Sequence, residues 1–197
     1  MVLDLGKGHA EHMIEVIDGA LAEAKLGYPD LSSIGVSVGP GSFTGVRVGV
    51  AAARGLALAL KLPAVGVTTS EALGAETRAE WPDRKVLVVT KAGDRAALAL
   101  FDEAGNTIEA PRLATFDEAA ELALAMRPVL AGDMVPEVLA RAGSDFDLGP
   151  LRATADIRRF AEIAATRTAD GTMPKPLYLR PADAKPNLNF ALPVKGG

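Results

Sequence analysis

The stretch Val38–Leu60, VGPGSFTGVRVGVAAARGLALAL, decides the fold because a glycine-rich turn runs directly into an alanine-rich helix. A short β-branched strand over Ser33–Val38 leads into it, and Pro63 ends the helix before another strand at Ala64–Val67. Apolar residues at helical spacing predict a helix from about His9 to Leu26 before this unit. A further helix is expected from about Ser70 to just before Trp81. The order α, β, α, β, α predicts an α/β fold.

The glycine loop has two interpretations. Unpaired N–H groups and the dipole of the following helix favour an anion, and Gly39 and Gly41 allow a phosphate close to the backbone. However, no lysine followed by Ser or Thr ends the loop, and the third glycine has the wrong spacing for G-x-G-x-x-G. The sequence therefore favours a tight turn in which Ser42 or Thr44 caps the helix, with phosphate binding as the alternative.

The helix behind the loop carries small residues at every fourth position, which lets another helix approach closely. These residues are Gly45, Gly49, Ala53 and Ala57. Its charged residues, Arg47, Arg54 and Lys61, are seven apart and form one stripe. A helix that is apolar nearly all round is covered nearly all round. The cover is either the first helix of this chain or a second protein, and the pattern leaves both open.

After Pro82 the pattern changes to strands joined by short turns, which predicts an antiparallel meander. The motif TFDE at Thr115–Glu118 is a capping box that opens a helix to about Arg127. The expected strands are Lys85–Thr90, Ala96–Phe101, Thr107–Pro111 and Val129–Ala131, the later helices are Val135–Ala142 and Asp156–Thr168, and the tail from Pro174 is extended. We place a domain boundary at residues 81–84, which gives domains 1–83 and 84–197.

Composition narrows the function classes. The 197 residues carry a formal net charge of −4, which argues against a stand-alone nucleic-acid binder. The absence of cysteine excludes disulfides, zinc–thiolate sites and cysteine nucleophiles. His9 and His12 are three apart, whereas a helical metal pair usually sits four apart, so a metal site is not favoured there. Charged residues at the N-terminus and within the apolar helix argue against a signal peptide and a membrane span, so a cytoplasmic protein is expected.

Three stretches resemble the TsaB/YeaZ family, long labelled glycoprotease-like or M22 peptidase-like. They are GKGHAEHMIEVIDGALAEA, SVGPGSFTGVRVGVAAARGLALALKLPAVGVTTSEAL and PLYLRPADA. The resemblance is clear over Gly6–Glu76, weaker through the second half, and returns at 178–180. It implies two ribonuclease-H-like α/β domains of the actin/hexokinase/Hsp70-like (ASKHA) fold.

The same resemblance implies a partner role in making threonylcarbamoyladenosine on tRNA. It implies a heterodimer with the catalytic paralogue TsaD, a third member in the ATPase TsaE, and contact with tRNA only through the complex. A homodimer is expected when the partner is absent, because a large bare apolar surface is unfavourable in water. The helices expected to pair with the paralogue in a four-helix bundle present one surface. Its residues are Met13, Ile14, Ile17, Leu21, Gly45, Arg47, Gly49, Ala53 and Arg54.

The resemblance also implies that the protein is not an enzyme. The paralogue's V-N-H-M-E-G-H segment supplies two metal-binding histidines, and these fall on Thr69 and Leu73 here. No metal or other cofactor is expected, apart from weak ATP or ADP binding within the complex at Gly39, Gly41, Ser42 and Thr44. The alternative is an enzyme, either an ATP-dependent phosphotransferase or the metallopeptidase of the old label.

The chain departs from the family pattern in two places. The family begins with a strand and a hairpin before the first helix, whereas here Met1–Asp4 abuts Leu5–Gly8 directly, so we expect a truncated or dropped stretch. The segment Lys91–Arg95 reads KAGDR where the family tends to have D-A-R-R. A nucleotide contact from this turn is therefore not expected.

Overall fold

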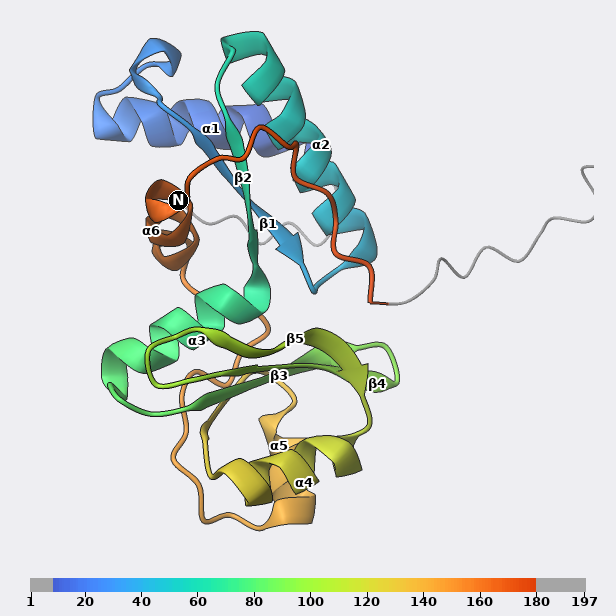
Figure 1. The fold of residues 1–197 in the computed structure, drawn as a ribbon. Coiled ribbons are helices and arrows are strands. Elements are labelled where there is room, and N and C mark those ends of the chain that lie inside the picture. The colour runs from blue at the N-terminus through green and yellow to red at the C-terminus, as the bar shows by residue number, and fades with distance from the viewer. Residues whose placement is uncertain (1–8, 180–197) are drawn as a thin grey trace, which may run out of the picture.

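The computed structural model describes residues 9–179, with side chains from residue 12 onward. The predicted strand stub at Met1–Asp4 and the motif residue Arg180 lie outside the described residues. Two layered units are stacked along the long direction of the molecule (Figure 1). Each contains a β-sheet with helices on both faces, as the sequence pattern predicts for an α/β protein.

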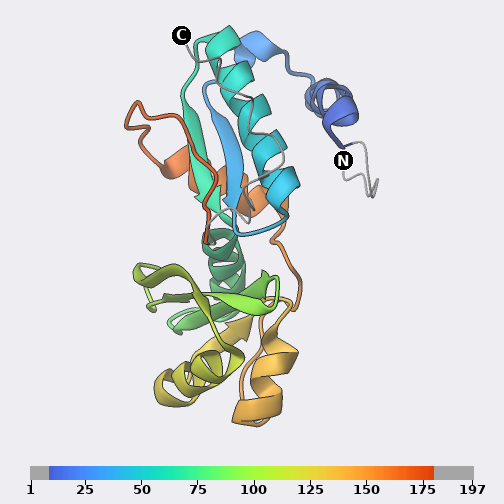
Figure 2. The same cartoon turned by 90° about the vertical axis from the view of Figure 1, so that its right-hand side faces the viewer.

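The first unit is built around two parallel strands, β1 (Ile34–Gly39) and β2 (Ala64–Thr68). Helix α2 (Phe43–Leu60) connects them and packs on one face of the pair, while α6 (Ile157–Thr166) packs on the other face. Helix α1 (His9–Ala24) and the short 3-10 helix η1 (Tyr28–Asp30) precede β1. Figure 2 shows α1 beside α2 and set away from the two strands.

The second unit is a four-stranded sheet in the order β5-β4-β3-β6. Strands β3 (Val86–Ala92), β4 (Arg95–Phe101) and β5 (Thr107–Ala114) form the predicted antiparallel meander, and β6 (Val129–Ala131) pairs with β3 in parallel. Helix α3 (Thr69–Glu80) covers one face, and α4 (Phe116–Met126) and α5 (Val135–Ala142) cover the other. Strand β5 runs three residues beyond its predicted end at Pro111. An edge strand tolerates a proline, because the missing N–H can face away from the ladder.

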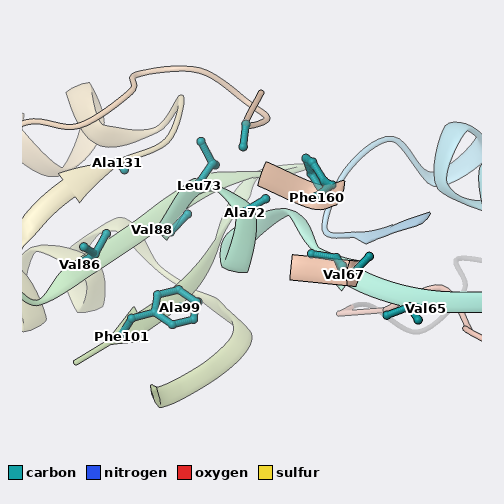
Figure 3. Packing of buried hydrophobic residues seen from close by; sticks show 12 residues of the cluster. Val65, Val67, Ala72, Leu73, Val86, Val88, Ala99, Phe101, Ala131 and Phe160 are labelled. Carbon is teal, nitrogen blue, oxygen red and sulfur yellow. The ribbon is translucent and has the colours of Figure 1, made fainter. Parts of the chain in front are cut away.

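Side chains along β3 alternate between two hydrophobic clusters because successive residues of a strand point to opposite faces. Val86 and Val88 join the cluster on the α3 side, and Leu87 and Val89 join the cluster on the α4–α5 side. The first cluster crosses between the units (Figure 3): it contains Val67 of β2 and Phe160 of α6 as well as residues of α3, β3 and β4. The two units therefore share one continuous core through α3.

Capping boxes form at the starts of two helices, and one of them was predicted. At α4 the hydroxyl of Thr115 accepts from the Glu118 N–H at 3.1 Å, and the Glu118 carboxylate accepts from the Thr115 N–H at 2.6 Å. Thr68 and Glu71 form the same reciprocal pair at α3. The hydrogen bond from the Thr115 backbone N–H is the main cause that holds the pKa of Glu118 below its usual range. The capping box predicted at TFDE is confirmed.

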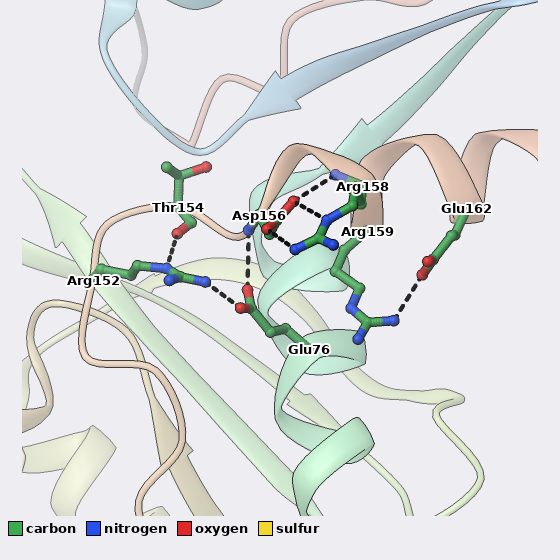
Figure 4. A network of polar contacts seen from close by, with 7 residues as sticks. All are labelled: Glu76, Arg152, Thr154, Asp156, Arg158, Arg159 and Glu162. Carbon is green, nitrogen blue, oxygen red and sulfur yellow. Dashed lines mark hydrogen bonds and ion pairs between the residues drawn. The ribbon is translucent and has the colours of Figure 1, made fainter. Parts of the chain in front are cut away.

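The chain returns to the first unit after the second is complete. Glu76 on α3 accepts hydrogen bonds from the Arg152 side chain and, at 3.0 Å, from the Asp156 N–H, which fixes the start of α6 beside α3 (Figure 4). The Arg158 guanidinium bonds the Asp156 carboxylate and is the main cause of the strongly lowered pKa of that carboxyl group. The division at residues 83 and 84 stays a prediction, and α6 belongs spatially with β1 and β2.

Residues 167–178 form a strap that runs from α6 across β2 to α2 (Figure 1). Arg167 donates to the Gly66 carbonyl and to the Glu71 carboxylate, both at 2.6 Å. Pro174 is buried against Gly66, and its Cβ atom lies 3.2 Å from where a Cβ atom at Gly66 would stand. The Leu177 N–H donates to the Val38 carbonyl at 2.8 Å. The tail from Pro174, which was predicted to be extended, therefore lies as a strap against the first unit up to the last described residues.

Candidate functional site

The glycine loop between β1 and α2 is a tight turn that ends in a capped helix. The Ser42 hydroxyl accepts from the Gly45 N–H at 3.3 Å, so Ser42 rather than Thr44 is the N-cap. Gly39 has a φ of +94°, which residues with a side chain rarely adopt, and this explains why glycine stands at this position. Gly41 and Thr44 are exposed beside it. The loop is therefore positioned by helix capping and backbone geometry.

The surroundings of the loop offer little to a phosphate. The Leu177 carbonyl oxygen of the strap lies 3.8 Å from where a side chain at Gly39 would begin, so an acceptor faces this side of the loop. The loop residues Gly39–Thr44 include no lysine or arginine, and the first cation after them is Arg47. One helix N-terminus contributes about 0.3–1 kcal/mol to holding an anion. Weak ATP or ADP binding at Gly39–Thr44 stays a prediction.

The two positions that match the paralogue's metal-binding histidines are both buried. Thr69 is 4% exposed, with its hydroxyl 3.4 Å from that of Ser37, and Leu73 is fully buried in the α3-side core. A hydrocarbon side chain cannot ligate a metal. Within residues 9–179 no group of three His, Cys, Asp or Glu side chains is placed to hold an ion. The residues present do not fit the metal site of the paralogue.

We expect the purified protein to bind no stoichiometric transition metal and to cleave no peptide, because Thr69 and Leu73 supply no adequate ligand set. Elemental analysis of the tag-free protein, together with a protease assay, checks this. Thr69→Ala serves as a control, since removing a hydroxyl that ligates nothing leaves the metal content unchanged. One equivalent of zinc or iron in the unaltered protein would overturn this expectation.

One face of helix α2 packs against the sheet of its own unit. Val50, Ala53 and Ala57 are 2%, 6% and 1% exposed. A side chain at Gly49 would begin 4.0 Å from the Val36 methyl group of β1. The sequence-based assignment of Ala53 to a partner surface is wrong in this respect, because Ala53 packs inside its own unit. Gly49 lies at the border between that unit and the exposed face.

The opposite face of α2 is uncovered among the described residues. Leu58 is 74% exposed, and Ala51, Gly55 and Ala59 repeat the four-residue spacing of small residues on this side. A side chain built at Gly55 meets no atom within 4 Å. Glycine inside an exposed helix costs about 1 kcal/mol of stability relative to alanine. No contact within the described chain explains why glycine stands at position 55.

Helix α1 extends this exposed surface. Met13, Ile17 and Leu21 are only half-buried, and Ile14 is 48% exposed. No residue of α1 enters either of the two hydrophobic clusters that the described residues form. Gly45, Arg47 and Arg54 are also exposed. Apart from Ala53, the predicted interface residues therefore lie at least partly on the surface of the described chain.

The apolar character of α2 alone fits either a helix that spans a membrane or a helix packed within a protein. By length and composition it is the one helix of the described chain that is able to cross a membrane, with a mean hydropathy of 1.4 over Phe43–Leu60. Its buried residues Val50, Ala53 and Ala57 pack against its own sheet, and they make up 17% of this span. The described residues leave the outward face of α2 uncovered.

One feature of this surface is not predictable from sequence spacing. The Nε atom of Arg47 donates to the Tyr178 hydroxyl at 2.8 Å, and the Phe43 and Tyr178 ring centroids lie 5.9 Å apart. Phe43 is 51% exposed and Tyr178 is 50% exposed. The strap therefore brings a residue from the far end of the chain to the start of α2. The only available signal was the reappearance of the family resemblance at Tyr178.

Comparison with known proteins gives a consistent set of relatives. Residues 4–178 match the family model described as TsaD: tRNA N6-adenosine threonylcarbamoyltransferase. An uncharacterized protein of Mycobacterium tuberculosis is 34% identical over 185 residues, which is 91% of this chain and 79% of that protein. The tRNA threonylcarbamoyladenosine biosynthesis protein TsaB of Buchnera aphidicola (subsp. Schizaphis graminum) is 33% identical over 86 residues, 44% of this chain and 41% of its own.

The fold has a counterpart among solved structures. A Pseudomonas aeruginosa protein, described as uncharacterized with similarity to peptidase YEAZ, overlays with a TM-score of 0.70 and 26% identity. The overlay covers 88% of this chain and 85% of that chain. The predicted α/β fold of the actin/hexokinase/Hsp70-like class is confirmed by this likeness.

Proposed function

The chain belongs to the TsaB/YeaZ family, within the wider group matched by the TsaD model, and we propose that it is a non-catalytic partner of a TsaD-type paralogue. The names of its relatives support a role in the biosynthesis of threonylcarbamoyladenosine on tRNA. In this proposal the paralogue performs the transfer. The present chain supplies a docking surface and reaches tRNA only through the complex.

The observation that carries the proposal is the uncovered outward face of α2. Leu58 is 74% exposed, and the position beside Gly55 is open space. Large exposed apolar surfaces on a folded chain usually mark interaction sites. Small residues at four-residue spacing allow the backbones of two helices to approach closely. We propose that a helix of the paralogue packs here, with α1 beside it, in a four-helix arrangement.

The absence of catalysis is proposed from the metal positions. Both positions are buried: Leu73 packs in the core, and the hydroxyl of Thr69 lies beside that of Ser37. A transferase that needs the paralogue's metal therefore has no equivalent centre at this place. The TsaE-type ATPase belongs to the proposal only as a further member of the complex implied by family membership.

When no partner is present, the same apolar face is expected to bury itself against a second copy, because closed two-fold dimers are the commonest oligomers. We expect the isolated protein to elute as a dimer and the mixture with its paralogue to elute as a heterodimer. Size-exclusion chromatography with light scattering measures both masses. Two separate peaks at micromolar concentrations, with no heterodimer, would contradict the proposal.

A further inference from the structure

The arginines of the described chain are, with few exceptions, paired with a carboxylate. Representative pairs are Arg84 with Asp147 at 2.8 Å and Arg167 with Glu71 at 2.6 Å. The exceptions are Arg47 and Arg54, which make no ion pair in the described part of the chain, and Arg78, which interacts at longer range with Asp102. The full set of paired arginines is Arg84, Arg95, Arg112, Arg127, Arg141, Arg152, Arg158, Arg159 and Arg167. The arginines without an ion pair are therefore concentrated on α2.

The unpaired charges have a regular spacing along one border of the outward face. Arg47, Arg54 and Lys61 are exposed and seven residues apart, which places successive charges about 10.5 Å apart along the helix axis. Phe43–Leu60 contains no acidic residue. A second copy of α2 therefore offers no carboxylate to this stripe, which can pair only with a helix that carries them.

Arg47 is held in place before any partner arrives. Its guanidinium carbon lies 3.6 Å from the Phe43 ring centroid and 5.2 Å from the Tyr178 centroid, and its Nε atom donates to the Tyr178 hydroxyl. Stacking on aromatic rings suits the planar guanidinium and limits the side-chain entropy that is lost on binding. Arginine and aromatic residues are also the commonest anchors of protein interfaces. The strap thus contributes to the same surface as α2.

We propose that the helix docking on α2 carries carboxylates at seven-residue spacing, which pair with Arg47 and Arg54 and fix its register. This inference rests on the proposed function and deepens it, since it names the chemistry by which the paralogue is selected. Complementary charge across an interface governs selectivity and association rate more than it governs total affinity. The stripe would then decide which helix docks, and the apolar face would hold it.

The test uses the full-length chain with Arg47→Glu and Arg54→Glu, singly and together, titrated with the purified paralogue by calorimetry. Lys91→Glu, an exposed lysine in the other unit, is the control with the same change in charge. We expect the double variant to raise Kd at least about tenfold at low salt. The control should stay within about twofold, and Arg54→Lys should retain most of the affinity.

Salt gives a second readout. The Kd of the unaltered protein is expected to rise between about 50 and 500 mM NaCl, and the Kd of the double variant to change much less. Circular dichroism melts verify that the variants fold. If the unaltered protein binds the paralogue and the double variant binds equally well, the charge inference is overturned while the proposed function stands. If the unaltered protein does not bind at all, the proposed function itself fails.

Discussion

Replacing Gly55 by leucine is expected to abolish binding of the paralogue while leaving the protein folded. The new side chain begins in open space, with no atom of the described chain within 4 Å of its Cβ. Leucine also favours a helix more than glycine does, by roughly 0.5–1 kcal/mol, so the monomer should become slightly more stable. At the interface the same side chain would fill the groove through which a second helix approaches. We expect Kd to rise at least about a hundredfold, or roughly 2.7 kcal/mol.

The matched control is Gly49→Leu, six residues earlier on the same helix. A side chain at Gly49 starts 4.0 Å from Val36 of β1, so the larger atoms of leucine meet the protein's own sheet. Overpacking of this kind costs about 1–3 kcal/mol of unfolding free energy. Urea unfolding and calorimetric titration of both variants separate the two effects. A folded Gly55→Leu protein that binds the paralogue with normal affinity would contradict the assignment of this face.

Replacing Gly132 by alanine should be among the most destabilising single changes in the chain. Gly132 follows β6 with a φ of +111°, and an added Cβ would stand 2.1 Å from the Val89 carbonyl oxygen. That oxygen belongs to the backbone of the central strand β3 and accepts from the Met134 N–H, so it cannot move aside freely. Backbone strain and overpacking each cost about 1–3 kcal/mol. We expect a loss of at least about 3 kcal/mol.

Gly143→Ala isolates the backbone contribution. Gly143 also has a positive φ, +86°, yet an added Cβ meets no atom within 4 Å. Its replacement should cost only the conformational strain, about 1–2 kcal/mol. Urea unfolding midpoints and slopes of the two variants measure the difference. Equal losses would show that the contact with Val89 is relieved at little cost.

Local patterns predicted much of the fold because their physics is local. The capping box at Thr115 and Glu118 involves groups only three residues apart, and it forms as expected. Strands β3 and β4 follow from two apolar runs joined by a short turn, with Val86 paired to Phe101. Helix α1 ends at Ala24 rather than Leu26, which reflects the usual uncertainty at helix ends.

The faces of α2 could not be assigned in the same way. Small residues recur every fourth position on two sides of this helix, once through Gly49 and Ala53 and once through Ala51 and Gly55. Only the position of β1 shows which set is buried. The position of the strap could not be predicted either, because the hydrogen bond between Arg47 and Tyr178 joins residues 131 positions apart. Such contacts depend on the complete fold and leave no periodic signal.

The central claim is that this chain supports a catalytic paralogue through α2 and performs no transfer itself. Formation of threonylcarbamoyladenosine on tRNA, measured in a reconstituted reaction, tests it most directly. Four mixtures are compared: the paralogue alone, this protein alone, both together, and the paralogue with Gly55→Leu, each with the remaining components of the reaction. We predict modified tRNA only when the paralogue is combined with the unaltered protein. Modification by this protein without the paralogue, or undiminished modification with Gly55→Leu, would contradict the account.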